Sequence, residues 1–268
     1  MHSPPPERPL DATPDNSRGR ADDDVCRPLR GQRVVVVGGT SGMGLGAVHA
    51  ATKAGAEVVV AGRRPAGLRE GVQSEEGDVR HVVLDITDEA AVRTVFEAIG
   101  SLDHLFVTAT PSSASGRFLD QDVEMARHFM NGKFFGSWAC ARYAAPRMHA
   151  GSITFLTGCV SVRPRSGLTM ATATFAALEA FSQALALELG PLRVNTIRPG
   201  LIDSDMWNFL DDDAREQLRR KTRETFPVRR MGSIDDIGHA ALFLMTNPYV
   251  TGTVLEVSGG ETLVSIDV

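Results

Sequence analysis

The sequence predicts an α/β protein built on a doubly wound parallel sheet with helices on both faces. Short valine-rich runs alternate along the chain with longer amphipathic segments, as expected when strands and helices alternate. The first run, Val34–Val37, is apolar at every position, which is typical of a strand buried on both faces. A glycine-rich turn at 38–44 follows it directly. Together these observations define a single-domain Rossmann-type fold.

Seven short runs rich in β-branched residues are predicted as strands. They are Arg33–Val37, Glu57–Ala61, Arg80–Leu84, His104–Thr108, Ser152–Thr157, Arg193–Ile197 and Thr253–Val257. Longer segments with apolar residues three and four positions apart are predicted as helices. They are Gly44–Ala54, Asp88–Ile99, Gln121–Ala145, Thr172–Leu189 and Ile234–Met245. Right-handed crossovers between parallel strands place such helices on both faces of the sheet.

The composition argues against several classes of protein. Hydrophobic residues make up 43% of the 268 residues and charged residues 23%, which allows a large buried core. The net charge of -5 predicts no nucleic-acid partner, and no apolar run reaches the ~20 residues of a membrane helix, so no membrane partner is predicted. Three scattered cysteines fit neither a disulfide framework nor a metal site. A cytoplasmic location is expected, because no secretory signal pattern opens the sequence.

Residues 1–30 differ in composition from the rest of the chain. Six of the 14 prolines and the acidic run Asp22–Asp24 lie in this stretch. It has little apolar surface to offset the entropy of ordering. We therefore predict a flexible tail over 1–30 and a single domain over 31–268.

The turn at 38–44 has the features of a phosphate-binding loop. Its glycines let the backbone turn sharply and approach a pyrophosphate, and the helix after it presents free N–H groups and a positive dipole end. Its place between a buried strand and a helix strengthens a signal that glycines alone give weakly. The residues predicted to hold the pyrophosphate are Gly38, Thr40, Ser41, Gly42, Met43 and Gly44.

The end of the second predicted strand favours NADP(H) over NAD(H). An NAD-binding protein of this fold usually carries a carboxylate there, which holds the ribose 2′-hydroxyl. This chain has Arg63 and Arg64 instead. Their guanidinium groups can pair with a 2′-phosphate through charge-assisted hydrogen bonds.

With these motifs the chain resembles the short-chain dehydrogenase/reductase (SDR) family over about residues 30 to 262. The spacing Gly38-x-x-x-Gly42-x-Gly44 is similar to the family's cofactor loop, and the ending 252–260 is equally typical. Segment 84–88 looks like its adenine-contacting segment, 193–200 like its sixth strand, and 201–204 like its nicotinamide loop. The resemblance implies further cofactor contacts by Asp85, Ile86, Ala109, Ile202 and Ser204.

The resemblance stops at the residues that perform the family's chemistry. The family reduces carbonyl groups with a serine, a tyrosine and a lysine, and with an asparagine that holds a water. Alignment of the helix around 175–179 places Gly158 at the position of the family's serine, Ala171 at that of the tyrosine and Phe175 at that of the lysine. Asn131 matches the asparagine. The chain has two tyrosines and three lysines, and none of them forms Tyr-x-x-x-Lys in any register.

Other polar groups are candidates to replace the missing proton donor. His128 lies one helical turn before Asn131, and these two residues are the predicted catalytic candidates. Thr157 and Cys159 flank Gly158 but are expected to point to the opposite face of the strand. Cys159 is therefore interpreted either as a nucleophile or as a small buried residue. Arg163 and Arg165 are candidates to bind an anionic substrate. Trp207 and Phe209 are candidates to close a lid over the substrate.

The sequence predicts an atypical SDR-like oxidoreductase that binds NADP(H) and a small-molecule substrate and works without the Ser-Tyr-Lys relay. The favoured reaction is hydride transfer to an activated biosynthetic intermediate. An iminium ion needs no proton donor to accept hydride, and a conjugated compound depends on a donor less than a ketone does. A non-redox cyclase, isomerase or pericyclase remains open. So does a pseudoenzyme that binds nucleotide as a structural ligand. Apolar surface on segments 121–145 and 172–189 predicts a homodimer or homotetramer.

Overall fold

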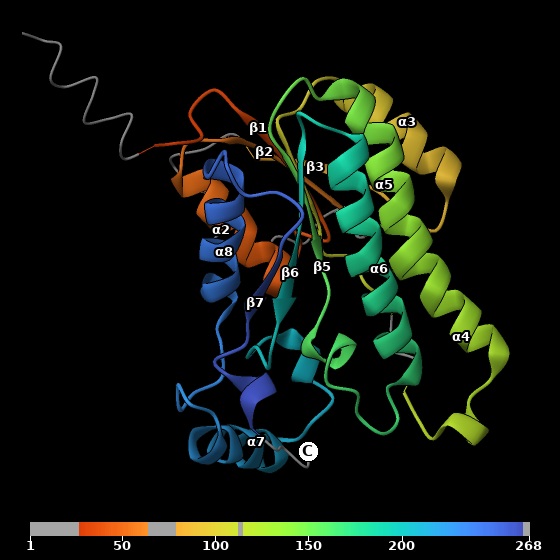
Figure 1. Ribbon diagram of the computed structural model, residues 1–268, viewed down its shortest axis with the longest axis vertical. Coiled ribbons are helices and arrows are strands. Elements are labelled where there is room, and N and C mark those ends of the chain that lie inside the picture. Colours follow the sequence, from red (N-terminus) through yellow and green to blue (C-terminus); the bar gives the residue numbers. More distant parts are fainter. Residues whose placement is uncertain (1–26, 64–78, 112–114, 265–268) are drawn as a thin grey trace, which may run out of the picture.

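The computed structural model describes residues 27–63, 79–111 and 115–264, and it confirms the predicted fold class. Seven parallel strands form one sheet in the order β3-β2-β1-β4-β5-β6-β7. The strands are β1 (Arg33–Val37), β2 (Glu57–Gly62), β3 (Val79–Val83), β4 (His104–Val107), β5 (Ser152–Leu156), β6 (Arg193–Pro199) and β7 (Val254–Val257). Figure 1 shows this sheet between two layers of helices.

Helices α2 and α8 cover one face of the sheet, and α3, α5 and α6 cover the other (Figure 1). The α-helices are α2 (Gly42–Lys53), α3 (Glu89–Ile99), α4 (Val123–Met130), α5 (Gly136–Ala144), α6 (Thr169–Glu188), α7 (Asp212–Thr225) and α8 (Ile234–Thr246). A π-helical segment, Asn131–Phe135, joins α4 to α5. Short 3-10 turns lie at Phe118–Asp120, Ala145–Arg147, Cys159–Ser161, Asp205–Trp207 and Glu261–Leu263.

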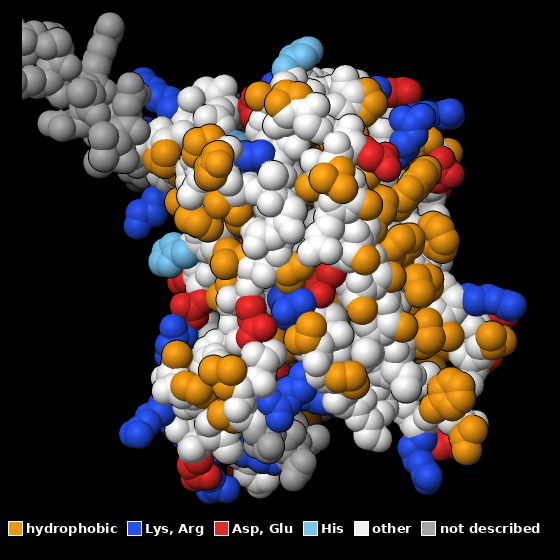
Figure 2. Space-filling model, in the orientation of Figure 1, with side chains coloured by type: hydrophobic (Ala, Val, Ile, Leu, Met, Phe, Trp, Pro, Cys, Tyr) orange, Lys and Arg blue, Asp and Glu red, His pale blue; other side chains and the backbone are white. Residues whose placement is uncertain are grey.

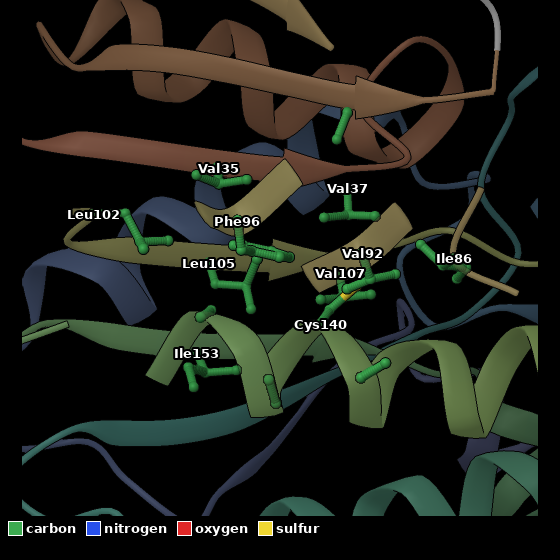
Figure 3. Close-up of a cluster of buried hydrophobic side chains, with 14 of the residues drawn as sticks. Val35, Val37, Ile86, Val92, Phe96, Leu102, Leu105, Val107, Cys140 and Ile153 are labelled. Carbon is green, nitrogen blue, oxygen red and sulfur yellow. The ribbon is translucent and has the colours of Figure 1, made fainter. Parts of the chain in front are cut away.

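Each central strand contributes to two hydrophobic clusters, one on each face of the sheet. Val35 and Val37 pack with Phe96 of α3 in the first cluster, which Figure 3 shows in close-up. Val34 and Val36 pack under α2 and α8 in the second. Because successive side chains of a strand point to opposite faces, a strand covered on both sides is apolar at every position.

The sheet has its switch point between β1 and β4. The chain continues from β1 to β2 on one side and from β4 to β5 on the other. In open α/β sheets the crevice beyond the carboxyl ends of such strands is where ligands bind. The phosphate-binding loop after β1 and residues 108–111 after β4 meet at this crevice.

The structure corrects the sequence prediction in three places. The predicted single helix 121–145 is divided by the π-helical segment. Helix α7 was not predicted, because it is highly charged; Asp211 caps it, and Leu218 is its main buried apolar side chain. The predicted tail is too long at its end, since Leu29 is buried and its N–H donates to the Ala54 carbonyl oxygen. The remainder of the predicted tail, 1–26, lies outside the described residues.

Candidate functional site

The phosphate-binding loop closes tightly against the end of β4. Gly38 has a φ of 91°, and a Cβ added there would lie 2.5 Å from Thr108 Oγ1. A Cβ added at Gly44 would lie 2.3 Å from the Gly38 carbonyl oxygen. The Thr108 hydroxyl donates toward the carbonyl oxygens of Val37 and Gly38, each at 3.1 Å, and fixes the loop.

The N-terminus of α2 faces this loop with its first N–H groups open. Ser41 is the N-cap residue, and its side chain makes no capping hydrogen bond. Thr40 approaches the end of β2, where its Cγ2 would lie 3.3 Å from a Cβ on Gly62. Half-buried Met43 packs against the cluster under α2 and α8. A glycine cradle with open N–H groups fits the pyrophosphate of a dinucleotide.

Two of the residues predicted at the adenosine end carry opposite charges near one another. Arg63 is exposed just after β2, and Arg64 lies outside the described residues. Asp85 accepts hydrogen bonds from the Thr87 N–H, at 2.9 Å, and from the Thr87 hydroxyl, at 2.8 Å. These bonds, with the Arg63 charge, hold the pKa of Asp85 below its ordinary value. Ile86, beside it, is buried.

Helix α7 holds the loop after β6 in place. Its arginines Arg215 and Arg219 form ion pairs with Asp203, at 3.0 and 2.8 Å. Partial burial alone would raise the pKa of Asp203. Hydrogen bonds from these guanidinium groups outweigh that effect and keep the pKa below its ordinary value. Ile202 and Ser204 on either side are both buried. The Ser204 Cβ would lie 4.0 Å from a Cβ on Gly42, so this loop reaches the phosphate-binding loop.

The two aromatic residues predicted as a lid differ in their packing. The Trp207 Nε1 donates to the Ile202 carbonyl oxygen at 2.8 Å, and Trp207 packs against the cluster that includes Leu201. Phe209 is 75% exposed, with its ring centroid 6.1 Å from that of Trp207. Trp207 therefore anchors this segment, while the face of Phe209 is open to a ligand.

Gly158, Ala171 and Phe175 lie together in an apolar corner between β5, α4 and α6. A Cβ added at Gly158 would lie 3.1 Å from the Phe175 ring. Ala171 and Phe175 pack with Phe129 of α4, whose ring centroid is 6.2 Å from that of Phe175. Both tyrosines have other environments, since the Tyr143 hydroxyl donates to Glu89 at 2.7 Å and Tyr249 is 98% exposed.

The π-helical segment turns Lys133, and not Asn131, into the protein interior. Asn131 and His128 are both exposed, whereas the Lys133 side chain is fully buried. The Lys133 Nζ donates to the Ala109 carbonyl oxygen at 3.2 Å and lies 5.9 Å from the Phe175 ring centroid. Asn131, which matches the family's asparagine, therefore lies at the surface of this segment, and the buried polar side chain is Lys133. A regular 3.6-residue period could not have indicated Lys133, because the π turn changes the helical register.

Burial sets the properties of the groups that flank Gly158. Removal of the Cys159 thiol from water raises its pKa to about 12, so it stays protonated and is not an activated nucleophile. The Thr157 hydroxyl donates to Glu179 of α6 at 2.9 Å. Glu179 also accepts from Arg198 at 2.6 Å, in a largely buried ion pair. Thr157 and Cys159 are thus structural, although β5 ends at Leu156, before both residues.

Arg163 and Arg165 are occupied by the C-terminal turn, which corrects their suggested role in anion binding. Arg165 forms an ion pair with the buried Glu261 at 2.5 Å. Arg163 donates to the carbonyl oxygens of Glu261 and Thr262, at 3.3 and 2.7 Å. The other Glu261 oxygen accepts from the Leu201 N–H at 2.8 Å. These arginines therefore tie the segment after β5 to the chain's last described turn.

Comparison with known proteins agrees with this geometry. The family described as Enoyl-(Acyl carrier protein) reductase matches residues 37–262. Carbonyl reductase family member 4 of Danio rerio is 30% identical over 239 residues, which cover 85% of this chain and 97% of that protein. A solved small-chain dehydrogenase in complex with NADPH is 34% identical, with a TM-score of 0.74, covering 87% of this chain and 99% of that one.

A further structural likeness concerns the fold alone. The MalC reductase/Diels-Alderase of Malbranchea aurantiaca has a TM-score of 0.81 at 24% identity, covering 88% of this chain and 98% of that one. The sequence match over most of the chain, together with the shared relatives, shows that this chain belongs to the short-chain dehydrogenase/reductase family. It is an oxidoreductase of that family.

Proposed function

We propose that this chain is an NADPH-dependent reductase that transfers hydride to an activated substrate without a Ser-Tyr-Lys relay. The observation that carries the proposal is the apolar corner of Gly158, Ala171 and Phe175 beside a complete phosphate-binding loop. The substrate is a small molecule, either an iminium ion or a conjugated compound.

The residues of the corner limit which substrates can react. When bound, the nicotinamide supplies the hydride. A ketone then becomes an alkoxide, which needs a proton donor, and losing a positioned donor typically costs about 10²–10⁴ in rate. Ala171 and Phe175 offer no proton. An iminium ion becomes a neutral amine, and a conjugated compound spreads its charge, so neither needs a donor in contact.

The test is to incubate the protein and NADPH with a panel of ketones, imines and enones, following nicotinamide oxidation and product mass. Plain ketones should show no measurable turnover, while a member of the activated classes is reduced. Brisk reduction of plain ketones contradicts the proposal. Conversion without nicotinamide oxidation identifies a cyclase or isomerase, and nucleotide binding without any conversion identifies a pseudoenzyme.

The preference for NADPH over NADH is proposed to depend on Arg63, together with Arg64. Arg63 is exposed at the end of β2, and no carboxylate takes the ribose-binding position in this sequence. A hydrogen bond between charged groups contributes about 1.5–3 kcal/mol. Arg63→Ala should therefore weaken NADPH binding by about 10-fold or more while NADH binding changes little. Calorimetry that gives both nucleotides the same loss of affinity would contradict this assignment.

A symmetric dimer through α4, α5 and α6 is proposed as the functional assembly. Figure 2 shows hydrophobic side chains gathered over α4 and α5, where Phe135 is 54% exposed and Trp138 is 38% exposed. Among the described residues, α6 is long and apolar enough to cross a membrane, yet only 28% of its apolar window is buried within the chain. A second copy of these helices would cover that surface, as isologous interfaces do.

The dimer is tested by light scattering at micromolar concentration. The parent protein should have twice the mass of one chain, and Trp138→Glu should shift it toward the monomer because a carboxylate would be buried at the interface. Lys53→Glu, at the exposed end of α2 on the other face of the sheet, is the control and should leave the mass unchanged. A monomeric parent protein contradicts the proposed assembly.

A further inference from the structure

Lys133 brings an ammonium group into a corner that its neighbours make apolar. Its side chain is 0% exposed, and within residues 27–63, 79–111 and 115–264 its Nζ has one hydrogen-bond acceptor, the Ala109 carbonyl oxygen at 3.2 Å. An ammonium carries three protons, so a single carbonyl satisfies it only in part. The ring of Phe175, with its centroid 5.9 Å away, provides the other stabilising contact.

Two glycines hold this ammonium close to the switch point of the sheet. A Cβ added at Gly132 would lie 2.4 Å from Pro111 Cγ, in the segment after β4. A Cβ added at Gly136 would lie 2.7 Å from Ile86 Cδ1, in the predicted cofactor segment after β3. The π-helical segment can therefore approach both segments closely, and Lys133 lies between these two glycines. Its position follows from the packing of the whole segment.

The same aromatic ring contacts both Lys133 and Gly158. The Phe175 ring lies 3.1 Å from a Cβ position on Gly158 and accepts the Lys133 charge on its face. Beside apolar, largely buried side chains the effective dielectric constant is lower than in water, so a charge one ring away acts on reacting atoms. The resemblance aligns the family's lysine with position 175, where this chain has phenylalanine. The structure instead has Lys133 on the facing helical segment, and the Phe175 ring separates it from the corner.

We propose that Lys133 is a positioning residue that supplies positive charge to the corner of Gly158, Ala171 and Phe175, and that this charge selects α,β-unsaturated carbonyl compounds over iminium ions. This inference rests on the proposed function and names its substrate class.

The chemistry follows from where charge develops. Hydride from NADPH adds to the β carbon, the electrons of the C=C bond move toward the carbonyl oxygen, and an enolate forms. Water then gives a proton to the α carbon, so one hydride and one proton are added and NADPH leaves as NADP⁺. A nearby cation stabilises the enolate through space, without contact. A plain alkoxide is a much stronger base and needs a donor in contact, while an iminium ion is repelled.

The charge of Lys133 is controlled mainly by its burial, which lowers its pKa to about 7. The Cys140 thiol of α5 faces it, but burial raises the pKa of Cys140 to about 12 and keeps it neutral. Glu179 of α6 is paired with Arg198, and Asp85 after β3 is held by the N–H and hydroxyl of Thr87. His128 of α4 is exposed. Lys133 is therefore charged below about pH 7 and neutral well above it.

The first test measures this charge directly by NMR on protein labelled at the lysine side chains. The chain has three lysines, Lys53, Lys133 and Lys221, so the spectrum is simple, and Lys133→Met assigns the buried one. We expect the Lys133 ε-carbon to titrate near pH 7, with and without NADP⁺. A Lys133 that remains neutral at pH 6 overturns the proposal.

The second test compares the reduction of an enone and a cyclic iminium ion from pH 6 to pH 9. Enone reduction by the parent protein should be faster below pH 7 and fall as Lys133 loses its proton. Lys133→Met should lower it by about 10-fold at pH 6, remove this pH dependence and favour the iminium ion, whereas Lys53→Met changes nothing. A merely structural lysine would give a variant with an unchanged pH profile.

The outcomes separate this inference from the function on which it rests. Faster reduction of the iminium ion by the parent protein at pH 6, unaffected by Lys133→Met, overturns the role of Lys133 and leaves the proposed reductase intact. Failure of hydride transfer to every compound contradicts the reductase and the selectivity together. The NMR titration then still decides whether the corner carries a charge.

Discussion

Alanine in place of Gly44 is expected to abolish dinucleotide binding. The added Cβ would lie 2.3 Å from the Gly38 carbonyl oxygen and 2.6 Å from Thr108 Oγ1. Gly38 cannot retreat, because it is itself pressed against the backbone of Ala109. The backbone at positions 38 and 44 must therefore move apart, at the point where the loop would approach a pyrophosphate. NADPH affinity should fall by at least about 10²-fold, with a loss of about 1–3 kcal/mol in the free energy of unfolding.

Gly190→Ala is the matched control for this experiment. A Cβ at Gly190 meets nothing within 4 Å, so the same chemical change should leave NADPH binding as it is. Calorimetry and chemical denaturation on both variants separate a local effect on the loop from a general loss of stability. A folded Gly44→Ala variant that binds NADPH as tightly as the parent contradicts the role assigned to this loop.

Methionine in place of Lys133 is expected to stabilise the protein at neutral pH. Burial lowers the pKa of Lys133 from 10.5 to about 7, so below pH 7 the fold carries the full cost of a buried charge. Between about pH 7 and pH 10 the unfolded chain binds more protons at this site than the folded chain, so stability rises with pH. The variant removes a cost on the order of a few kcal/mol at pH 7, less the loss of the bond to Ala109.

The measurement is denaturant unfolding of the parent and the variant at several pH values. The advantage of Lys133→Met should be largest at or below pH 7 and shrink toward pH 10, because the parent then sheds its buried charge. Exposed Lys53→Met should show no such trend. A difference in stability that stays constant from pH 6 to pH 10 shows that Lys133 is not a buried titrating group. A stability cost of this kind is expected where a buried group is kept for function.

The strands and the cofactor loop could be predicted because local patterns determine them. The continuous valines of β1 require burial on both faces, and the glycines at 38 and 44 have no space for a side chain. Helix α7 escaped prediction because tertiary contacts hold it, including the ion pairs of Asp203 with Arg215 and Arg219. Such pairs leave no apolar periodicity in the sequence.

The polar residue of the reactive corner could not be predicted, because a change of helical register selects it. The resemblance to the family pointed to Asn131, whereas the π turn buries Lys133, two positions later. The partners of Arg163 and Arg165 were equally hidden, since Glu261 lies almost a hundred residues away along the chain. Chemistry that depends on which distant segments meet requires the fold.

We propose that this protein moves hydride from NADPH to an activated carbon without a proton donor in contact. The most direct measurement uses NADPH carrying deuterium at the transferred position, with a conjugated carbonyl compound and its saturated ketone as paired substrates. Mass spectrometry should find one deuterium at the β carbon of the reduced enone and none in the product of the saturated ketone. Deuterium that enters the saturated ketone at a comparable rate, or that stays on the nicotinamide while the enone is converted, would contradict the account.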